Sequence, residues 1–394
     1  MIERDYLIVG AGTAGFSACE GIRQHDKKGS ITMVGNELYG PYERPALSKA
    51  FLQKSHPLPH EFCYHGADWF VKHKVDLRLG TFITQFNIDR HLAVLGTGQT
   101  IHFDRAVLAT GSRALRPQVA GYDLGNIIYL RTMADALALR EMTPLEDGVT
   151  IVGGGLLAAE VAASLAMTKR KVTMLSRDVS LWQHLVDPAT ADWLTTYFKA
   201  KGVTLHMRDD VSGFEGKTVV KNIQTKNGGR HTVSLVIVAI GSEMNLGLVR
   251  NTPLATPKGS PVNEYLETEE KGIYSVGDIA LFPDKIYGGV RRETHWEHAK
   301  QSGLVAGGNI TGRKRTKYEY LPHYSSKLFD LEFEFVGDFQ LPPVRVVTEG
   351  LREKRSFILR YMSGDKLRAA VLCNRKPAEV EAVKKQIRGD YTGK

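Results

Sequence analysis

The chain has 394 residues, of which 42% are hydrophobic and 24% are charged, a composition that excludes collagen-like, mucin-like and intrinsically disordered proteins. The 52 Lys and Arg residues exceed the 43 Asp and Glu residues and give a net charge of +9, which is too small to indicate nucleic-acid binding but favours acidic partners or anionic substrates. The length predicts two or three domains, and with no long apolar run and no secretory signal in the sequence we expect a cytoplasmic protein without a transmembrane segment.

The first elements predicted along the chain are a strand, a glycine-rich turn, a helix and a second strand within residues 6–34. The turn contains Gly10, Gly12 and Gly15 in the spacing G-x-G-x-x-G. These glycines permit a tight turn, a close approach of the backbone to a pyrophosphate, and close packing of the helix on the strand. They predict a dinucleotide site. Glu37, just past the second strand, is placed to accept hydrogen bonds from the ribose, although the position also suits a surface carboxylate.

The same order of elements recurs over residues 149–175, about one domain's length further along the chain. A short apolar strand leads into Gly153 and Gly155, and Ala158 takes the third position, where alanine still permits close packing. The repeat predicts a second dinucleotide-binding domain. Two such domains in one chain imply two dinucleotides, most simply FAD and a nicotinamide cofactor, NADH or NADPH.

Three polar residues near the second repeat are candidates for contacts with the nicotinamide cofactor. Glu160 follows Ala158 on the predicted helix and could reach towards the nicotinamide, but an ordinary helix-face carboxylate explains it equally well. Arg177 and Asp178 come directly after the second strand, where a cation accommodates the 2′-phosphate of NADPH and an acid selects the free hydroxyl of NADH. The choice between NADH and NADPH stays open, as does a solvated loop that contacts neither.

The pattern of the remaining residues predicts two places where the chain passes from one domain to the other, and a smaller C-terminal module. Apolar strands at residues 106–111 and 235–241 mark the crossings, and another strand ends in Gly277-Asp278 before a helix over 295–310. Further on, the pattern indicates antiparallel strands and a closing helix, at residues 331–335, 344–347, 357–361 and 380–387. Residues 311–394 carry 18 Lys and Arg against 11 Asp and Glu, so +7 of the net charge of +9 lies there.

We therefore predict an α/β protein with two Rossmann-like dinucleotide-binding domains and a small C-terminal α+β domain. The FAD-binding domain is expected to be discontinuous, at residues 1–114 and 241–311. The NAD(P)H-binding domain would occupy residues 115–240. The C-terminal domain, at residues 312–394, would serve as a dimerisation or interface module.

The segment from Pro41 to Lys49, PYERPALSK, resembles the R-P-x-L-S-K signature of a group of FAD-dependent pyridine nucleotide oxidoreductases. This group includes ferredoxin and rubredoxin reductases, monodehydroascorbate reductase and apoptosis-inducing factor. The resemblance covers the whole chain and implies a glutathione-reductase-like fold of the three-layer ββα type. The segments that look most similar to monodehydroascorbate reductase are residues 42–52, 276–278, 291–299 and 320–331.

The resemblance implies roles for individual residues. Arg44 would contact the FAD, and Lys49 would lie beside flavin N5, where a cation stabilises negative charge on the reduced ring. Asp278 would hydrogen-bond the ribityl chain. His295 and Trp296 would shield the flavin edge, although core packing is the alternative for both. Other residues implied in cofactor binding are Thr110, Gly111, Gly241 and Gly277. The residues implied in catalysis are Lys49, Glu160, His295 and Arg292, the last as the binder of an anionic organic radical.

The three cysteines are Cys19, Cys63 and Cys373, and they form neither a C-x-x-C motif nor a metal-ligand pair. Relatives that reduce disulfides or peroxides need a thiolate near the flavin. Residues 40–50 hold no cysteine. The sequence therefore predicts an oxidoreductase without a redox-active disulfide and without a metal.

The implied reaction passes a hydride from NADH or NADPH to flavin N5 and then single electrons to an acceptor. The acceptor would be a small acidic iron–sulfur protein, a radical such as monodehydroascorbate, or a quinone. Residues 323–326 stand where ferredoxin reductases of the group carry a tryptophan pair, and His323 replaces a tyrosine of monodehydroascorbate reductase, so the acceptor stays open. The alternative is a flavoprotein like apoptosis-inducing factor, which forms a charge-transfer complex with NADH and turns over slowly. A homodimer is a further option, and nucleic acid is not an expected partner.

Overall fold

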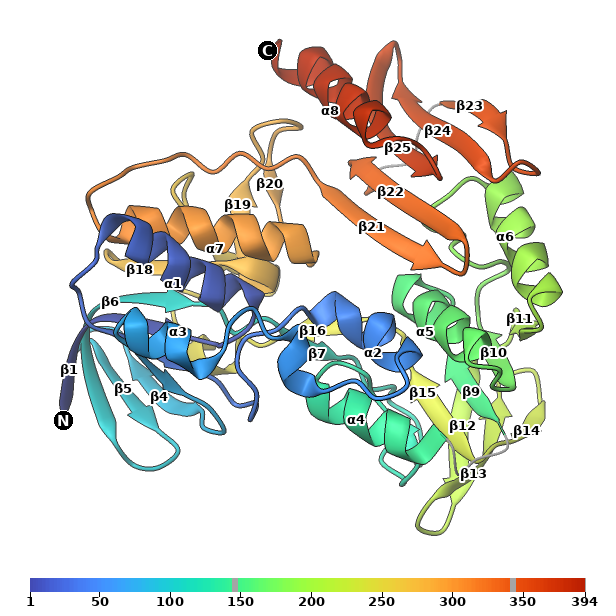
Figure 1. Cartoon of the computed structure of the whole chain (residues 1–394), viewed down its shortest axis with the longest axis horizontal. Coiled ribbons are helices and arrows are strands. Elements are labelled where there is room, and N and C mark those ends of the chain that lie inside the picture. Colours follow the sequence, from blue (N-terminus) through green and yellow to red (C-terminus); the bar gives the residue numbers. More distant parts are fainter. Residues whose placement is uncertain (144–147, 341–344, 394) are drawn as a thin grey trace. The chain divides into compact units, whose positions relative to one another are not determined.

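The computed structural model describes residues 1–143, 148–340 and 345–393 (Figure 1). Contacts divide the chain into two compact units, each assembled from segments that are far apart in sequence. Unit 1 comprises Met1–Arg44, Leu58–Arg113 and Glu243–Tyr324. Unit 2 comprises Pro45–Pro57, Ala114–Ser242 and Ser325–Lys394. The finer division into three domains stays a prediction. Within the described ranges, no helix is long and apolar enough to cross a membrane.

Unit 1 is built on a sheet with the strand order β3-β2-β1-β6-β5-β4, and β18 also pairs with β6. Five of these strands are parallel: β1 (Ile2–Val9), β2 (Ile31–Val34), β3 (Val75–Arg78), β6 (Thr100–Leu108) and β18 (Ile273–Ser275). The other two, β4 (Ile83–Asn87) and β5 (Leu92–Leu95), are antiparallel. Because both faces of the parallel strands are covered, the end of β1 and all of β2 are buried. A smaller sheet joins β17 (Ser260–Pro261), β19 (Ala280–Pro283) and β20 (Val290–Arg291).

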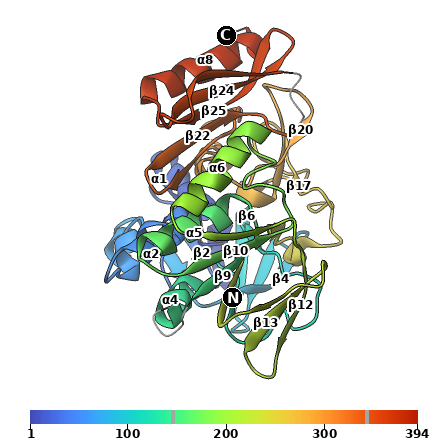
Figure 2. The ribbon, with the colours of Figure 1, turned by 90° about the vertical axis from the view of Figure 1, so that its right-hand side faces the viewer.

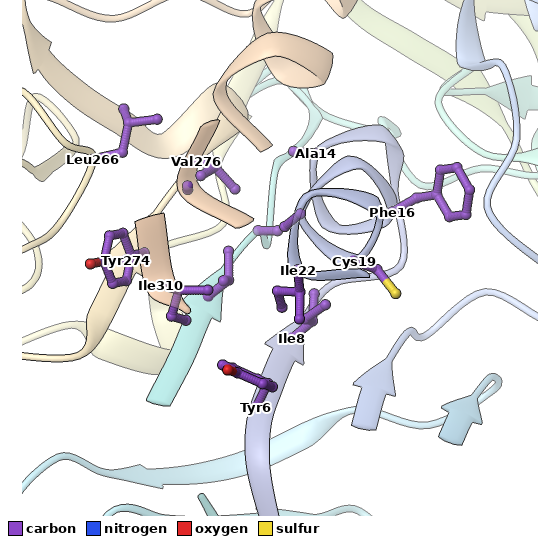
Figure 3. Packing of buried hydrophobic residues seen from close by; sticks show 14 of the residues in the cluster. Tyr6, Ile8, Ala14, Phe16, Cys19, Ile22, Leu266, Tyr274, Val276 and Ile310 are labelled. Atoms are coloured by element: carbon purple, nitrogen blue, oxygen red, sulfur yellow. The ribbon is translucent and has the colours of Figure 1, made fainter. Parts of the chain in front are cut away.

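Helices α1 (Thr13–His25) and α7 (Trp296–Ile310) pack closely against each other in unit 1. A Cβ atom at Gly303 would lie 2.2 Å from the Ala14 carbonyl oxygen, so the small residue lets the two backbones touch. Ile8 of β1, Ile22 of α1 and Ile310 of α7 meet in the hydrophobic core that holds these elements together (Figure 3). The short helix α3 (Ala67–Lys72) precedes β3. This core fixes the start of α1, and with it the first glycine turn.

Unit 2 contains a parallel sheet with the order β11-β10-β9-β15-β8. Its strands are β8 (Ile127–Ile128), β9 (Val149–Val152), β10 (Val172–Ser176), β11 (Thr204–Met207) and β15 (Leu235–Val238). Its helices are α2 (Ala50–Gln53), α4 (Met133–Met142), α5 (Leu156–Met167) and α6 (Pro188–Ala200). A separate antiparallel sheet joins β12 (Val211–Gly216), β13 (Val220–Thr225) and β14 (Arg230–Thr232). The short strands β7 (Ser112–Ala114) and β16 (Ser242–Met244) lie where the chain passes between the units.

The C-terminal sheet has the order β21-β22-β25-β24-β23. Its strands are β21 (His323–Leu328), β22 (Leu331–Gly337), β23 (Arg345–Leu351), β24 (Ser356–Ser363) and β25 (Lys366–Cys373). Helix α8 (Pro377–Thr392) covers one face of this sheet (Figure 1, Figure 2). Trp182 packs edge-on against Phe333, and Trp193 packs edge-on against Phe357. These aromatic contacts join the sheet to the rest of unit 2.

The predicted α/β fold class is confirmed, and several element boundaries differ from the sequence pattern. The apolar runs at 106–111 and 235–241 extend past strands β6 and β15, which end at Leu108 and Val238. The strands end early because each run closes in a turn at a glycine with positive φ. The strand predicted at 344–347 corresponds to β23, which begins at Arg345, and Val344 lies outside the described residues.

Candidate functional site

The first glycine turn lies in unit 1, between β1 and α1. Gly10 adopts φ +115°, and a Cβ there would lie 2.2 Å from the Ala109 carbonyl oxygen. A Cβ at Gly15 would lie 1.9 Å from the Gly10 carbonyl oxygen, so only glycine lets the helix pack so closely on the turn. Gly12 is the N-cap of α1 and brings no side chain over the first-turn N–H groups. This cradle fits a pyrophosphate.

A carboxylate and a guanidinium stand beside this turn. Glu37 accepts hydrogen bonds from Tyr42 Oη at 2.6 Å and from Arg44 Nη2 at 2.8 Å. The Arg44 guanidinium also lies over the Tyr42 ring, 5.1 Å from its centroid. Arg44 Nη2 lies 3.9 Å from the position of a Cβ at Gly12, so Glu37 and Arg44 meet at the dinucleotide turn. The pairing with Tyr42 was not predicted from the sequence.

Thr110 and Gly111 extend the same edge of the sheet past β6. The Thr110 hydroxyl donates to the Asn245 carbonyl at 2.7 Å, and the Asn245 side-chain amide donates to the Thr110 carbonyl at 3.0 Å. The Asn245 N–H donates to the Gly111 carbonyl at 2.9 Å. Asn245 thus holds this loop beside Gly10, a role that the sequence did not indicate.

Gly277 and Asp278 follow β18 and reach the start of α1, since a Cβ at Gly277 would lie 3.0 Å from Ala14 Cβ. Asp278 is 7% exposed and accepts a hydrogen bond from the Ser112 hydroxyl at 2.5 Å. Arg292 donates to the Asp278 carbonyl at 3.2 Å. Within the described residues the half-buried Arg292 has no carboxylate within ion-pair distance, whereas its neighbour Arg291 is paired with Asp284. The role of Arg292 in binding an anion stays a prediction.

His295 and Trp296 open helix α7, also in unit 1. The His295 ring stacks on Tyr324, with centroids 3.7 Å apart and planes at 9°. Burial lowers the pKa of His295 to about 4, although the charge of Asp278 opposes the shift. The imidazole is therefore neutral near pH 7. Trp296 Nε1 donates to Tyr64 Oη at 2.7 Å, which ties α7 to the aromatic cluster around α1.

The second glycine turn lies in unit 2, between β9 and α5. Gly153 adopts φ +130°, and a Cβ there would lie 2.3 Å from the Ala239 carbonyl oxygen. Gly155 is the N-cap of α5, and a Cβ there would meet nothing within 4 Å. Ala158 is fully buried against the turn. Gly241, just past β15, accepts a backbone hydrogen bond from Leu115 at 3.0 Å. The open turn fits a second pyrophosphate.

Arg177 and Asp178, which follow β10, differ in their surroundings. Asp178 Oδ2 lies 2.9 Å from the position of a Cβ at Gly154, and its Oδ1 accepts from Gln183 Nε2 at 3.1 Å. The Asp178 carboxylate therefore stands at the glycine turn. The Arg177 side chain is exposed. Of the two, only Asp178 is held in place at the turn.

Lys49 and Glu160, predicted from separate motifs, meet in unit 2. Lys49 Nζ lies 2.7 Å from Glu160 Oε2, and Glu160 is 7% exposed. The same carboxylate accepts hydrogen bonds from the hydroxyls of Ser48, at 2.6 Å, and Ser326, at 2.8 Å. The sequence did not single out either serine for this contact. Both come from segments distant from Glu160 in the chain.

All three cysteines are free. Burial raises the pKa of Cys19 and of Cys373 to about 12, and it also raises the pKa of Cys63. A thiol with a raised pKa is a poor nucleophile because only the thiolate attacks. The candidate site therefore offers glycine cradles, carboxylates and cations rather than a thiolate.

Two glycine cradles of the dinucleotide-binding type, each followed by a carboxylate, are typical of an oxidoreductase that binds two dinucleotides. The predicted residues form one group in each unit. In unit 1 these are Gly10, Gly12, Gly15, Glu37, Arg44, Thr110, Gly111, Gly277, Asp278, Arg292, His295 and Trp296. In unit 2 these are Lys49, Gly153, Gly155, Ala158, Glu160, Arg177, Asp178 and Gly241. Their roles stay predictions.

Comparison with known proteins places the chain in a family. Residues 4–303 match the family model described as pyridine nucleotide-disulphide oxidoreductase. The chain is 33% identical over 351 residues to the peroxisomal monodehydroascorbate reductase 4 of Arabidopsis thaliana. The matched region covers 84% of this chain and 72% of that protein. It is 29% identical over 359 residues to the ferredoxin–NAD(+) reductase subunit of the benzene 1,2-dioxygenase system of Pseudomonas putida, covering 91% and 86%.

The comparison with solved structures also finds a redox protein that is similar over most of its length. The structure of the covalent putidaredoxin reductase–putidaredoxin complex is similar with a TM-score of 0.92 and 28% identity, over 99% of this chain and 94% of that one. The chain therefore belongs to the pyridine nucleotide-disulphide oxidoreductase family. It is an FAD-dependent oxidoreductase whose second cofactor is NADH or NADPH.

Proposed function

We propose that this protein passes electrons from NADH, by way of FAD, to a one-electron acceptor and uses no thiol in the relay. The observation that carries the proposal is the pair of glycine cradles, at Gly10 in unit 1 and at Gly153 in unit 2, in a chain whose three thiols have raised pKa values. When bound, FAD accepts the hydride of NADH and releases electrons one at a time.

The chain's own residues bind and orient these groups. Glu37 and Arg44 would bind the adenosine end and pyrophosphate of FAD, and Asp278 would bind its ribityl chain. Lys49, held by Glu160, would supply a positive charge beside the flavin, where it stabilises negative charge on the reduced ring. The neutral His295 ring, stacked on Tyr324, would help to exclude water from the flavin edge.

The preference for NADH is supported by the position of Asp178. Its carboxylate stands at the second glycine turn, where it can accept hydrogen bonds from the ribose hydroxyls of NADH and repels the 2′-phosphate of NADPH. Arg177 is exposed. We therefore assign NADH as the reductant.

The acceptor is proposed to be anionic. Arg292 offers a guanidinium without a carboxylate partner among the described residues, which suits either an organic anion radical or an acidic patch on a small iron–sulfur protein. Relatives named as monodehydroascorbate reductase and as ferredoxin–NAD(+) reductase support both classes equally. The homodimer and the cytoplasmic location stay predictions.

Stopped-flow spectroscopy tests the proposal with the purified, FAD-loaded protein. We expect rapid bleaching of the flavin absorbance by NADH, slower bleaching by NADPH, and fast return of the absorbance with ferricyanide, a quinone or a ferredoxin. A persistent long-wavelength band with negligible turnover would contradict the enzyme assignment and favour the slow, NADH-responsive alternative. A protein that remains colourless when refolded with FAD would remove the basis of both.

A further inference from the structure

Glu160 is a buried carboxylate on a helix whose only other polar side chain is Ser164. It lies on α5, where its neighbours Ala159 and Val161 are fully buried, and its own exposed fraction is 7%. A buried carboxylate needs hydrogen-bond donors to offset the loss of water. Within the described residues three donors serve it, and all three come from outside α5.

The donors are divided unevenly between the two carboxylate oxygens. Oε2 receives the Ser48 hydroxyl at 2.6 Å and the Lys49 ammonium at 2.7 Å. Oε1 receives the Ser326 hydroxyl at 2.8 Å, which is its single donor in the described part of the chain. Loss of the Ser326 hydroxyl would therefore leave one buried oxygen without a partner and free the carboxylate to rotate away from Lys49.

The strand that carries Ser326 explains why its hydroxyl points inward. Along β21, Ser326 and Leu328 are buried, whereas Ser325 and Lys327 are exposed. This alternation is the period of two expected of a strand with one buried face. Ser325 is therefore a neighbour of the same residue type on the opposite face.

The segment 48–53 is also held to α5 by hydrogen bonds to Ser164. Ser164, one turn after Glu160, donates to the Ser48 carbonyl at 2.7 Å and accepts from Gln53 Nε2 at 2.9 Å. These contacts fix the backbone of Ser48, next to Lys49, so the position of the Lys49 ammonium depends on its own side chain and on its ion pair with Glu160. The geometry of the Lys49–Glu160 pair therefore depends on the orientation of Glu160.

We infer that Ser326 is a positioning residue, through which the C-terminal sheet fixes the Glu160 carboxylate and thereby holds the Lys49 ammonium where the flavin is reduced. The inference rests on the proposed function of Lys49 and Glu160. It assigns to the C-terminal segment a part in the NADH half-reaction, in addition to any contact with the acceptor.

The test compares Ser326→Ala with Ser325→Ala in the full-length, FAD-loaded protein. The loss of a hydrogen bond to a charged group can change a rate or equilibrium constant by a factor of about 10 or more. We expect Ser326→Ala to slow flavin reduction by NADH about 10-fold and to lower the flavin midpoint potential, because the ammonium no longer stabilises the reduced ring as well. Ser325→Ala should match the wild type in both, and Ser326→Thr, which keeps the hydroxyl, should retain most of the rate.

A double-mutant cycle separates positioning from a general structural effect. In a Glu160→Gln background, adding Ser326→Ala should change the rate less than about 2-fold, since the group that it positions is gone. A full 10-fold loss in that background, or equal behaviour of Ser326→Ala and Ser325→Ala, overturns the inference. If the wild-type protein itself is not reduced by NADH, the proposed function fails instead, so the two failures are distinguishable.

Discussion

Two adjacent residues, Arg177 and Asp178, offer opposite cofactor preferences, and their surroundings separate them. The Asp178 carboxylate is held at the glycine turn by Gln183, while Arg177 is exposed. We predict that Asp178→Ala weakens NADH binding by about 10- to 100-fold, because two hydroxyls lose a charged acceptor. NADPH binding should change little or improve. Titration of the FAD-loaded, oxidised protein with NAD⁺ and NADP⁺ measures both affinities.

Arg177→Ala is the matched control for this prediction. It removes the neighbouring charged side chain, and we expect less than about a 3-fold change in either affinity. A loss of NADP⁺ affinity that exceeds the loss of NAD⁺ affinity in Arg177→Ala would contradict the assignment of NADH and show that this loop binds a 2′-phosphate.

His298, which contacts the carbonyl of Gly277 after β18, is expected to contribute to the pH dependence of stability. The side chain is fully buried, and its ring nitrogens contact Tyr318 Oη at 2.7 Å and the Gly277 carbonyl at 3.2 Å. Burial lowers the pKa of His298 to about 4, although the contact with the Gly277 carbonyl opposes the shift. Below its ordinary pKa of about 6.5 the unfolded chain therefore binds a proton that the folded chain does not.

The sign of this difference predicts that stability falls as the pH drops from about 6.5 towards about 4 and is unaffected by this group at higher pH. His298 alone should remove about 2 kcal/mol between about pH 7 and about pH 5. Urea unfolding at the two pH values measures the loss. His298→Gln, which keeps a hydrogen-bonding side chain without a titration, should shrink the loss by that amount, and an unchanged pH dependence would rule out His298 as its source.

At the scale of elements, the contact between α1 and α7 positions the first glycine turn. Ala14, in the first turn of α1, touches both Gly303 of α7 and Gly277, which follows β18. We predict that Gly303→Ala lowers the free energy of unfolding by about 1–3 kcal/mol, since the new methyl group forces the helices apart. FAD should dissociate more readily as well, because the start of α1 moves. Thermal unfolding and flavin release measure the two effects.

Gly389→Ala on α8 is the control for the helix contact. A Cβ at Gly389 would meet nothing within 4 Å, and the residue has an ordinary helical backbone. The substitution should therefore stabilise the protein by about 0.5–1 kcal/mol through helix propensity. Gly303→Ala behaving like Gly389→Ala would show that α1 and α7 do not depend on close contact.

The elements that the sequence predicted well have a strong local pattern. Helices α1 and α5 follow apolar strands and glycine turns, so both the element and its start could be inferred. Strands β21 and β25 were not predicted. The sequence of β21, HYSSKL, is mostly polar, while β25 is buried along most of its length and lacks the alternation of a half-buried strand. Their positions are set by the sheet around them.

At the scale of the whole chain, the sequence names the candidate residues one by one but does not indicate which of them form pairs. Lys49 and Glu160 were named from separate motifs, and no local pattern indicates that they form an ion pair. Ser326 joins them from a third segment. The stacking of His295 on Tyr324 depends in the same way on long-range folding. Local spacing predicts which residues have suitable chemistry, whereas tertiary packing decides which of them meet.

The distribution of charge over the chain leads to the last prediction. Residues 311–394 carry 18 Lys and Arg against 11 Asp and Glu. Within this segment, Lys354 and Lys385 are exposed and belong to unit 2, whereas Lys27 and Lys72 are exposed in unit 1. The two pairs allow the same change of net charge to be made in different places.

If the acceptor is a small acidic iron–sulfur protein attracted by the C-terminal charge, its reduction rate at low acceptor concentration should fall steeply with added salt. Replacing Lys354 and Lys385 by Glu should lower that rate about 10-fold at low ionic strength. Replacing Lys27 and Lys72 by Glu should lower this rate by less than about 3-fold. These substitutions weaken only the long-range attraction between the protein and the acceptor and leave the charge of the C-terminal segment unchanged. Flavin reoxidation by a ferredoxin, followed at several salt concentrations, gives these rates. Equal effects of the two double substitutions would mean that net charge alone attracts the acceptor, and a rate insensitive to salt would favour a small organic acceptor at Arg292.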